Sequence, residues 1–561
     1  MIAAPLLAAA GAALSLLAPA APAPPDFPRD LQALLETVSP ETMRAHVKFL
    51  ASDLLEGRGT GTRGGEIAAE YIATQFELCG LKPAGTGESF RQNVPLAGVT
   101  TLPGTTLEIA TASDGRPLVL NEDFVVWTDE QEEVVDAYAP VVFVGYGIQA
   151  PEANWDDYKG LDVSGKILLM LVNDPPSEDP SHFGGPALTY YGRWTYKYEI
   201  AARLGAKGAL LVHSDAGAGY GFEVVKNSWG RERPEVARDA NSPRALALGG
   251  WLTESFSREL LKWCGHDLDA LRAAAAKRDF VPVELPARAA AHVKSSIRRF
   301  ETANVLGRIE GGDPALREEA VFFTAHYDHL GIGDGDSGDR IHNGAVDNAS
   351  GVAVLLELAR VFSRSPVRPR RSLVFMGVAA EEGGLRGSAY YAANPIVPIG
   401  KIAAVVNIDG IPLDGETSDF VFLGAERSTL RANAERAAKD LRFEITPDPR
   451  PEQGSFYRSD QFSFAKAGVP GFLLDPGTRY AGKPENWGVE RFREYNEKRY
   501  HRPGDEYRDD MDFSGAAKVG KIAFHVGWQI ACEDALPAWN AGDEFEAARK
   551  KAVAEAAPAA R

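Results

Sequence analysis

Four short runs of apolar residues in the second half of the chain place the tightest limits on its fold. They cover residues 320–324, 372–378, 402–408 and 471–474. Between the first two, residues 349–362 carry apolar side chains three and four positions apart, which is the spacing of one helix face. Strands that alternate with helices form sheets covered on both sides. The sequence therefore predicts an α/β sheet with helices on both faces.

Three of these runs are each followed closely by side chains of a metal-binding type. His326 follows the first run, the pair Glu381 and Glu382 follows the second, and Asp409 follows the third. In an open α/β sheet, functional groups collect outside the carboxyl ends of the strands. We therefore expect these residues, which are far apart in the chain, to meet at one rim of the sheet.

Two further candidates complete this set. Asp347 lies where a loop enters the predicted helix, and His501 lies in a late loop. Each residue alone has an ordinary explanation, since an aspartate can cap a helix and a histidine can be a hydrogen-bonded core residue. Together they offer the carboxylate oxygens and imidazole nitrogens that suit zinc or a similar divalent ion. Two such ions typically share a bridging carboxylate or water, so we predict a two-metal site.

The same residues lie in five short motifs that follow one another in a fixed order. They are Ala-His-Tyr-Asp-His-Leu-Gly (325–331), Asp-Asn-Ala-Ser-Gly (347–351), Ala-Glu-Glu-Gly (380–383), Asn-Ile-Asp (407–409) and Tyr-His (500–501). The order resembles the co-catalytic zinc aminopeptidases of clan MH, whose relatives include glutamate carboxypeptidase and the glutaminyl cyclases. Residues 49–58 also resemble the opening helices of this family, so the similarity covers about residues 40–100 and 300–530.

The resemblance implies two zinc ions and a role for each ligand. Asp347 would bridge the ions, His326 and Asp409 would complete one of them, and Glu382 and His501 would complete the other. In this family the peptide bond after the bridging aspartate is commonly cis.

The resemblance also implies the residues that act beside the ions. Glu381 would be the general base, and Asp328 would orient His326, with Asp460 as a further supporting residue. Tyr457 is the implied donor to the oxyanion, and ordinary packing is the alternative for this side chain.

The middle of the chain has a different pattern of apolar residues. Apolar runs suited to buried strands occupy residues 141–144, 167–172 and 209–212, with helical patterns between the later ones. This segment resembles the protease-associated domain that is often inserted in the family. The predicted organisation is a signal peptide (1–23), the N-terminal part of the catalytic domain (24–135), the insert (136–288), the main part of the catalytic domain (289–540) and a flexible or loosely helical tail (541–561).

Composition narrows the cellular setting and the partners. Residues 1–25 carry no charged side chain and contain small-residue sites of the cleavage type, which indicates a secreted or periplasmic protein. An uncleaved membrane anchor is the alternative; otherwise no stable membrane insertion is expected. The net charge of −18 disfavours nucleic acid and anionic lipid. The three cysteines, Cys79, Cys264 and Cys532, are interpreted as small buried residues.

The sequence thus predicts a zinc metallopeptidase, an aminopeptidase acting on peptides or proteins. A carboxypeptidase or a glutaminyl cyclase on the same fold is the alternative, although cyclases typically keep one zinc and all five ligands are present here. A non-catalytic receptor-like protein should have lost ligands or the base, and the chain has lost none of them.

Overall fold

A computed structural model describes residues 27–557, apart from 180–181, 219–220, 230 and 334–337. The predicted signal peptide, 1–23, lies outside the described residues. Within the described part, no helix combines the length and the apolar character needed to cross a membrane. The three cysteines are free thiols, of which Cys264 is buried in a hydrophobic core.

The four predicted strands lie side by side and run parallel. They are β17 (Ser372–Val378), β14 (Ala320–His326), β18 (Ile402–Asn407) and β21 (Gly471–Pro476), in that order across the sheet. Every residue of β14, β17 and β18 is buried. Such continuous burial requires cover on both faces, which is why these strands read as unbroken apolar runs.

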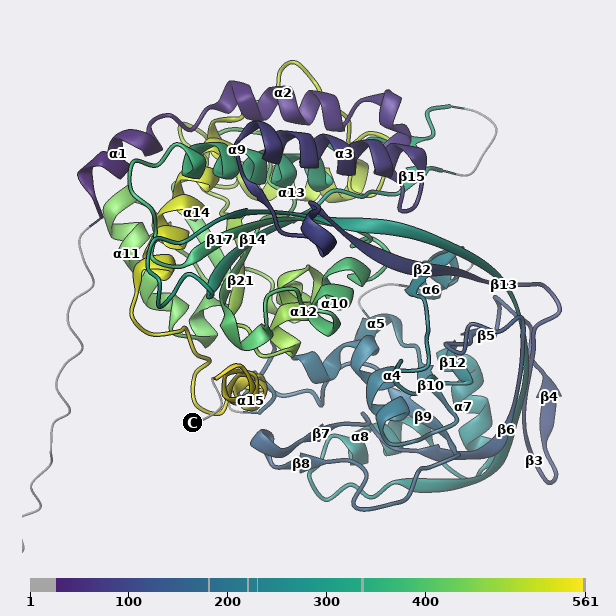
Figure 1. The fold of residues 1–561 in the computed structure, drawn as a ribbon. Helices are drawn as coiled ribbons and strands as arrows, with labels where there is room; N and C mark the ends of the chain where they lie inside the picture. Colours follow the sequence, from purple (N-terminus) through teal and green to yellow (C-terminus); the bar gives the residue numbers. More distant parts are fainter. Residues whose placement is uncertain (1–26, 180–181, 219–220, 230, 334–337, 558–561) are drawn as a thin grey trace, which may run out of the picture.

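Helices supply this cover on both faces of the sheet (Figure 1). The neighbouring residues Phe322 and Phe323 of β14 point in opposite directions, as alternation along a strand requires. Phe323 packs with Phe375 in the larger core, and Phe322 packs with Phe464 in the smaller one. On the first face lie α2 (Pro40–Leu50), α3 (Arg63–Leu78), α9 (Gly351–Ser363) and α14 (Ser514–Cys532); on the second lie α10 (Arg386–Ala393) and α12 (Gln461–Lys466). The predicted α/β sheet is confirmed.

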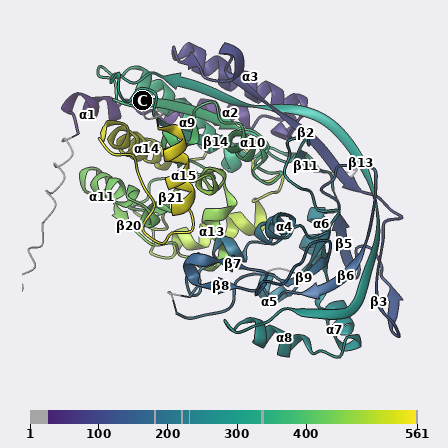
Figure 2. The same ribbon diagram turned by 60° about the horizontal axis from the view of Figure 1, so that its bottom comes forward.

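One long strand, β13 (Val283–Ile309), belongs to two sheets. Its last part pairs antiparallel with β17 and with β2 (Arg91–Thr101) in the catalytic sheet. Its first part pairs antiparallel with β3 (Thr106–Thr111) and β6 (Val134–Phe143) in a second sheet. The chain therefore leaves the catalytic sheet along β2 and returns along β13, and this pair of strands connects the two units (Figures 1 and 2).

The second unit has its own sheet and its own hydrophobic core. After β13 and β6 the sheet continues through β9 (Ile167–Leu171), β10 (Gly208–Val212), β12 (Leu248–Leu252) and β5 (Phe124–Trp127). The core runs from Leu107 to Val293, and we call this unit the insert.

The insert is wider than the predicted 136–288, because residues 135 and 136 lie within β6, and residues 288 and 289 lie within β13. The sequence did not reveal the edges of the insert, because β3 and the start of β6 alternate exposed and buried residues. This alternation is a weaker signal of a strand than an unbroken apolar run.

The C-terminal segment takes the helical one of its two predicted forms. It contains α15 (Glu546–Ala556), which docks on the catalytic unit instead of lying loose. Arg549 is only 4% exposed, and its guanidinium donates to the carbonyl oxygens of Ile402 (2.9 Å) and Pro537 (3.2 Å). A Cβ on Gly400 would lie 2.1 Å from the carbonyl oxygen of Ala552, so the helix packs directly against the backbone there. The sequence of this Ala-rich, charged segment does not reveal these contacts, because they depend on one arginine and one close backbone contact.

We expect Arg549→Met to loosen α15. The change leaves two carbonyl groups without a charged donor, which should cost about 2 kcal/mol locally. Hydrogen–deuterium exchange of residues 546–556 should become faster than in the unmodified protein. Lys551→Met, at an exposed position of the same helix, is the matched control and should leave the exchange unchanged. Equal exchange in the two variants would mean that Arg549 does not anchor this helix.

Candidate metal centre

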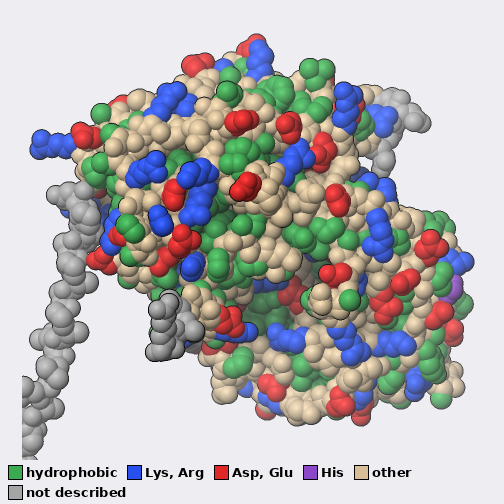
Figure 3. Space-filling view, in the orientation of Figure 1, with side chains coloured by type: hydrophobic (Ala, Val, Ile, Leu, Met, Phe, Trp, Pro, Cys, Tyr) green, Lys and Arg blue, Asp and Glu red, His purple; other side chains and the backbone are tan. Residues whose placement is uncertain are grey.

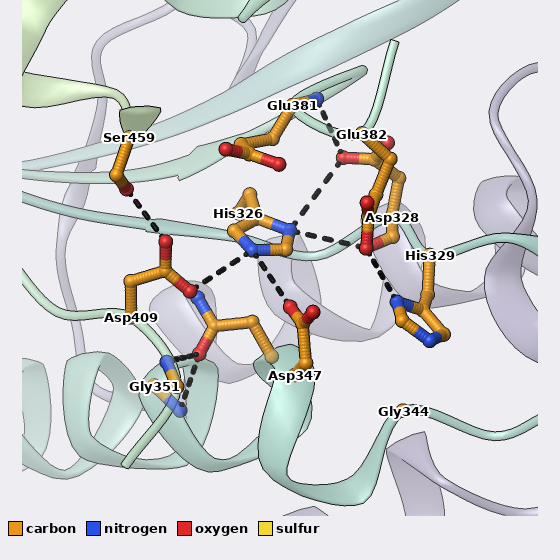
Figure 4. A network of polar contacts seen from close by, with 12 residues as sticks. His326, Asp328, His329, Gly344, Asp347, Gly351, Glu381, Glu382, Asp409 and Ser459 are labelled. Carbon is orange, nitrogen blue, oxygen red and sulfur yellow. Dashed lines mark hydrogen bonds and ion pairs between the residues drawn. The ribbon is translucent and has the colours of Figure 1, made fainter. Parts of the chain in front are cut away.

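The five predicted ligands meet around the carboxylate of Asp347. Figure 4 shows four of them: His326, Asp347, Glu382 and Asp409. His326 Nε2 lies 3.3 Å from Asp347 Oδ1 and 3.1 Å from Asp409 Oδ1. His501 Nε2 lies 3.3 Å from Asp347 Oδ2 and 3.2 Å from Glu382 Oε2. The two oxygens of Asp347 thus face two separate pairs, each made of one imidazole and one carboxylate.

These separations fit the donors of a tetrahedral ion. Ligand atoms about 2.0–2.2 Å from a tetrahedral zinc lie about 3.3–3.6 Å from one another. The four distances between histidine nitrogens and carboxylate oxygens are 3.1–3.3 Å. The donor set of imidazole nitrogens and carboxylate oxygens also suits zinc. The residues therefore fit a pair of divalent cations that share Asp347.

The protonation of the two histidines points the same way. Burial alone would lower the pKa of His501, but the charge of Glu382 and the contact with Asp347 raise it to about 11. The pKa of His326 is likewise raised against the effect of burial, by Asp409 and Glu381. Positive charge is therefore favoured at both positions among these buried carboxylates. A bound cation supplies that charge and leaves each imidazole neutral, as coordination requires.

The sheet explains why these residues meet. β17, β14 and β18 are adjacent and parallel, so their carboxyl ends lie on one rim. His326 is the last residue of β14, and Glu382 and Asp409 follow the ends of β17 and β18. The structure thus brings together at this rim the residues that strand-end placement predicted. Asp347 reaches the rim from the turn Ala345–Ser350 that precedes α9.

The turn that carries Asp347 is held by its neighbours. The Asp347–Asn348 peptide bond is cis, as the resemblance implied. The Asn348 side chain donates to the carbonyl of Ile408 (3.1 Å) and accepts from the amide of Gly410 (3.2 Å), which ties this turn to the loop carrying Asp409. Asp505 adds a second tie, because its buried carboxylate accepts from the amides of Val346 and Asp347 at 3.0–3.2 Å.

Asp328 supports both a ligand and the predicted base. His326 Nδ1 donates to the backbone carbonyl of Asp328 (3.1 Å), whereas the Asp328 carboxylate lies 3.9 Å away. That carboxylate instead accepts from the amide of Glu381 (3.0 Å) and from the hydroxyl of Thr60 (2.8 Å). Asp328 therefore orients His326 through its main chain, leaving Nε2 to face the ions, and positions Glu381 through its side chain.

His329 was not singled out from the sequence, although it lies in the same motif as His326. Its Nδ1 is 2.6 Å from Glu382 Oε1, which is a direct hydrogen bond and too short to span a metal ion. His329 is buried. It therefore occupies one oxygen of Glu382 and leaves Oε2 for the side of His501.

Ser459, the neighbour of the predicted supporting residue Asp460, is the residue that holds the ligand Asp409. The hydroxyl of Ser459 donates to Asp409 Oδ2 (2.6 Å) and accepts from the side-chain amide of Asn407 (2.7 Å). Asp460 is fully buried, and burial raises its pKa to about 7, while the charge of His326 opposes the rise. Among the described residues, Ser459 and not Asp460 hydrogen-bonds this ligand.

The predicted oxyanion donor, Tyr457, has its hydroxyl engaged elsewhere. It donates to Glu544 (2.9 Å) and accepts from Arg427 (2.9 Å). Tyr500 lies closer to the chemistry, because its ring stacks on the ligand His501 with centroids 3.9 Å apart. Burial raises the pKa of Tyr500, and Asp347 and Glu382 raise it further, so its phenol keeps its proton. The assignment of Tyr457 stays a prediction, and Tyr500, in the motif Tyr-His, is the alternative that these contacts offer.

Residues 304–527 match the model of peptidase family M28. This part of the chain belongs to peptidase family M28. The match confirms the family that the ordered motifs indicated, and we call residues 304–527 the M28 domain. The insert lies outside the matched residues, so its resemblance to a protease-associated domain stays a prediction.

Curated relatives match parts of the chain. A probable zinc metalloprotease of Pyrenophora teres f. teres is 29% identical over 204 residues, covering 35% of this chain and 42% of that protein. Leupeptin-inactivating enzyme 1 of Streptomyces exfoliatus is 27% identical over 247 residues, covering 43% of this chain and 51% of that protein. The chain spans about half the length of the curated relatives it matches.

Solved structures with similar folds share little sequence. An aminopeptidase from Aneurinibacillus sp. strain AM-1 has a TM-score of 0.48 and 20% identity, covering 90% of this chain and 97% of that chain. A zinc aminopeptidase from Bacillus subtilis has a TM-score of 0.39 and 18% identity, covering 87% and 94%. Similarity at this level carries no argument about activity, and the fold assignment rests on the topology given above.

Arg58 ties the N-terminal segment to the M28 domain. It is fully buried, and its guanidinium donates to the carbonyl oxygens of Leu50, Tyr327 (2.8 Å), Asn343 (2.6 Å) and Gly344 (2.9 Å). Tyr327 follows a ligand directly, and residues 343–344 lead to the bridging aspartate. One side chain therefore fixes two ligand loops, which accounts for the motif at residues 49–58.

We expect Arg58→Met to weaken zinc binding at least tenfold, because four carbonyl groups lose their donor and two ligand loops lose their common anchor. Arg58→Lys should fall between this variant and the unmodified protein, since an ammonium keeps the charge without the planar set of donors. Zinc affinity measured by competition with a chromogenic chelator tests this, with folding checked by circular dichroism. Arg63→Met, at an exposed position, is the control. Unchanged affinity in folded Arg58→Met would refute the role.

Proposed function

We propose that this protein is a metallopeptidase that holds two zinc ions and removes N-terminal residues from peptides. One observation carries the proposal: the two oxygens of Asp347 each face a separate histidine–carboxylate pair. The complete ligand set and the presence of Glu381 speak against a receptor-like protein. A glutaminyl cyclase is also disfavoured, since such an enzyme typically needs one zinc.

Glu381 is placed to move the proton in this reaction. When bound, zinc lowers the pKa of a coordinated water and polarises the substrate carbonyl. Glu381 accepts the proton of the attacking water and later delivers it to the leaving amine. Burial raises the pKa of Glu381, with Asp409 adding to the rise and His326 opposing it, so the carboxyl is a stronger base than an exposed glutamate. The hydrogen bond that its backbone amide donates to the Asp328 carboxylate holds the main chain in place.

Tyr500 supplies the hydrogen-bond donor that the developing oxyanion needs. Its stacking on His501 holds the phenol beside the ions, and the raised pKa keeps it protonated. A preorganised neutral donor of this kind stabilises negative charge that grows on the carbonyl oxygen in the transition state.

The position of the candidate metal ligands favours cleavage near a chain end. His326, Asp347 and Glu382 line a cavity of about 2480 Å³ that is bounded by the M28 domain and by the insert. A folded protein segment does not enter such a cavity easily, whereas the end of a peptide does. The preference for the amino end comes from the resemblance to aminopeptidases and is the part that experiment must decide.

A panel of peptides with free and blocked ends tests the proposal. We expect hydrolysis of peptides with a free amino end, none after N-terminal acetylation, and little effect of C-terminal amidation. A chelator should abolish the activity, and added zinc should restore it, with two zinc ions per chain by elemental analysis. Cleavage that requires a free carboxyl end would make the protein a carboxypeptidase, and no hydrolysis at full zinc content would refute the proposal.

Glu381→Gln tests the general base. The amide cannot accept the proton, so kcat should fall by about 10²–10⁴-fold while the zinc content stays that of the unmodified protein. Glu318→Gln, in an exposed loop, should leave kcat unchanged. Normal turnover by Glu381→Gln at full zinc content would exclude the mechanism.

Tyr500→Phe and Tyr457→Phe separate the two tyrosines. Loss of the Tyr500 hydroxyl should lower kcat by about 10²-fold or more, since an oxyanion donor is removed. Loss of the Tyr457 hydroxyl should leave kcat within about twofold and instead lower the thermal midpoint, because Glu544 and Arg427 lose a partner. The reverse pattern in steady-state kinetics and thermal unfolding would restore the sequence-based assignment.

A further inference from the structure

The cavity at the metal centre contains more positive side chains than the net charge of the whole chain would suggest. The whole chain has a formal net charge of −18. The cavity, which we call the cleft, is nevertheless lined by arginines from both units. In the space-filling view a hollow separates the two units, and Lys and Arg side chains lie along its lower edge (Figure 3). Positive side chains thus gather in the region where a substrate must lie.

Pairing with acidic neighbours does not cancel this charge. Within the described residues, five cleft arginines have guanidinium groups without a hydrogen bond or an ion pair: Arg231, Arg244, Arg450, Arg458 and Arg499. Among the described acidic residues that line the cleft outside the metal centre, only Asp475 and Glu485 have side chains without a hydrogen bond or an ion pair. Unpaired cations therefore outnumber unpaired anions, and the cleft has an unused capacity for carboxylates.

Arg450 lines the cleft from the M28 domain. Burial lowers the pKa of Arg450, and the charge of Asp475, which lines the same cleft, opposes this effect. The Arg450 guanidinium lies over the ring of Phe492, 3.5 Å from its centroid, and its Nε is buried without a hydrogen-bond partner. A flat, stacked guanidinium with unused donors presents the arrangement that binds a carboxylate.

Arg231 lines the same cleft from the side of the insert. It is exposed, so its guanidinium is open to a ligand. Unpaired arginines of both units therefore line the cavity that also holds the candidate metal ligands.

We propose that the cleft selects anionic peptides, whose carboxylates near the scissile bond are bound by Arg450 and Arg231. The carboxylates are those of Asp and Glu side chains or of a nearby free carboxyl end. This inference rests on the proposed peptidase activity and adds its substrate class. An arginine fork binds a carboxylate through two parallel hydrogen bonds. Within a cleft walled by protein, such charges are less screened than on an open surface and raise the local concentration of an anionic substrate.

Matched peptides test the substrate class. Three series identical except for Glu, Gln or Lys next to the scissile bond would be compared by kcat/KM at low ionic strength. We expect Glu to exceed Lys by about tenfold or more, which corresponds to about 1.4 kcal/mol. The ratio should shrink at about 0.5 M salt, where the Debye length is only a few ångströms. Equal hydrolysis of the three series, or a preference for Lys, would overturn the inference and leave the peptidase intact. Hydrolysis of none would refute the peptidase itself.

Variants assign the preference to individual arginines. Arg450→Gln and Arg231→Gln should each lower the ratio of Glu to Gln substrates by about threefold or more, mainly through KM, with kcat for the Gln series changed little. Arg431→Gln, at an exposed position of helix α11 (Leu430–Leu441) outside the cleft, should keep the ratio of the unmodified protein. If both cleft variants keep that ratio while zinc content is normal, these arginines do not select the substrate.

Discussion

The carboxylate of Asp347 is the point on which the site depends. Its two oxygens serve two different histidine–carboxylate pairs, so a displacement of this one group disturbs both. The fold accordingly fixes it from several directions. Asp505 binds the amides of its turn, and Asn348 connects the turn to the next strand end. Arg58 holds the loop that leads to it. Much of the polar structure behind the rim serves to hold one carboxylate in one orientation.

This demand explains features that lie far from the ions. A buried arginine that binds only carbonyl groups is costly to bury, and its pKa falls to about 10 because of burial, although the charges of Asp505 and Asp347 oppose the fall. It persists because those carbonyls would otherwise be buried without partners. The N-terminal helices α2 and α3 are thus part of the site through Arg58, although they lie almost 300 residues before the bridging aspartate in the sequence.

The candidate ligands were predictable from the sequence, and most of the residues that support them were not. His326, Glu382 and Asp409 follow apolar strands, and these strands can be recognised from short runs of apolar residues. Their supports act through backbone groups: His326 is oriented by a carbonyl of Asp328, and Arg58 binds four carbonyls. Carbonyl groups are present at every residue, so such contacts leave no signature in residue type. His329 lies inside a recognised motif and Ser459 lies next to the predicted Asp460, but their roles depend on distances that only the fold supplies.

The same reasoning separates the two tyrosines and the limits of the insert. Tyr457 and Tyr500 are equivalent as residue types, and only tertiary packing decides which hydroxyl is consumed by Glu544 and which ring lies on His501. Likewise, β13 passes through both sheets without a break. A boundary drawn from composition cannot fall in the right place when one continuous strand belongs to two units.

The charge balance of the site shows why the cleft, rather than the ions, can decide which substrates enter. Two divalent cations would carry as much positive charge as Asp347, Glu381, Glu382 and Asp409 carry negative charge together. The loaded centre is therefore close to neutral and exerts little long-range attraction on a charged peptide. The potential that an approaching substrate meets is set by the residues around the centre, and there the unpaired charges are mainly arginines, supplied by the M28 domain and by the insert. A connection through β2 and β13 alone would let the two units move apart. The salt bridges Arg386–Glu235 and Lys466–Glu199 join them at two places beside the cleft, so the arginines of the insert are held over a centre that belongs to the other unit.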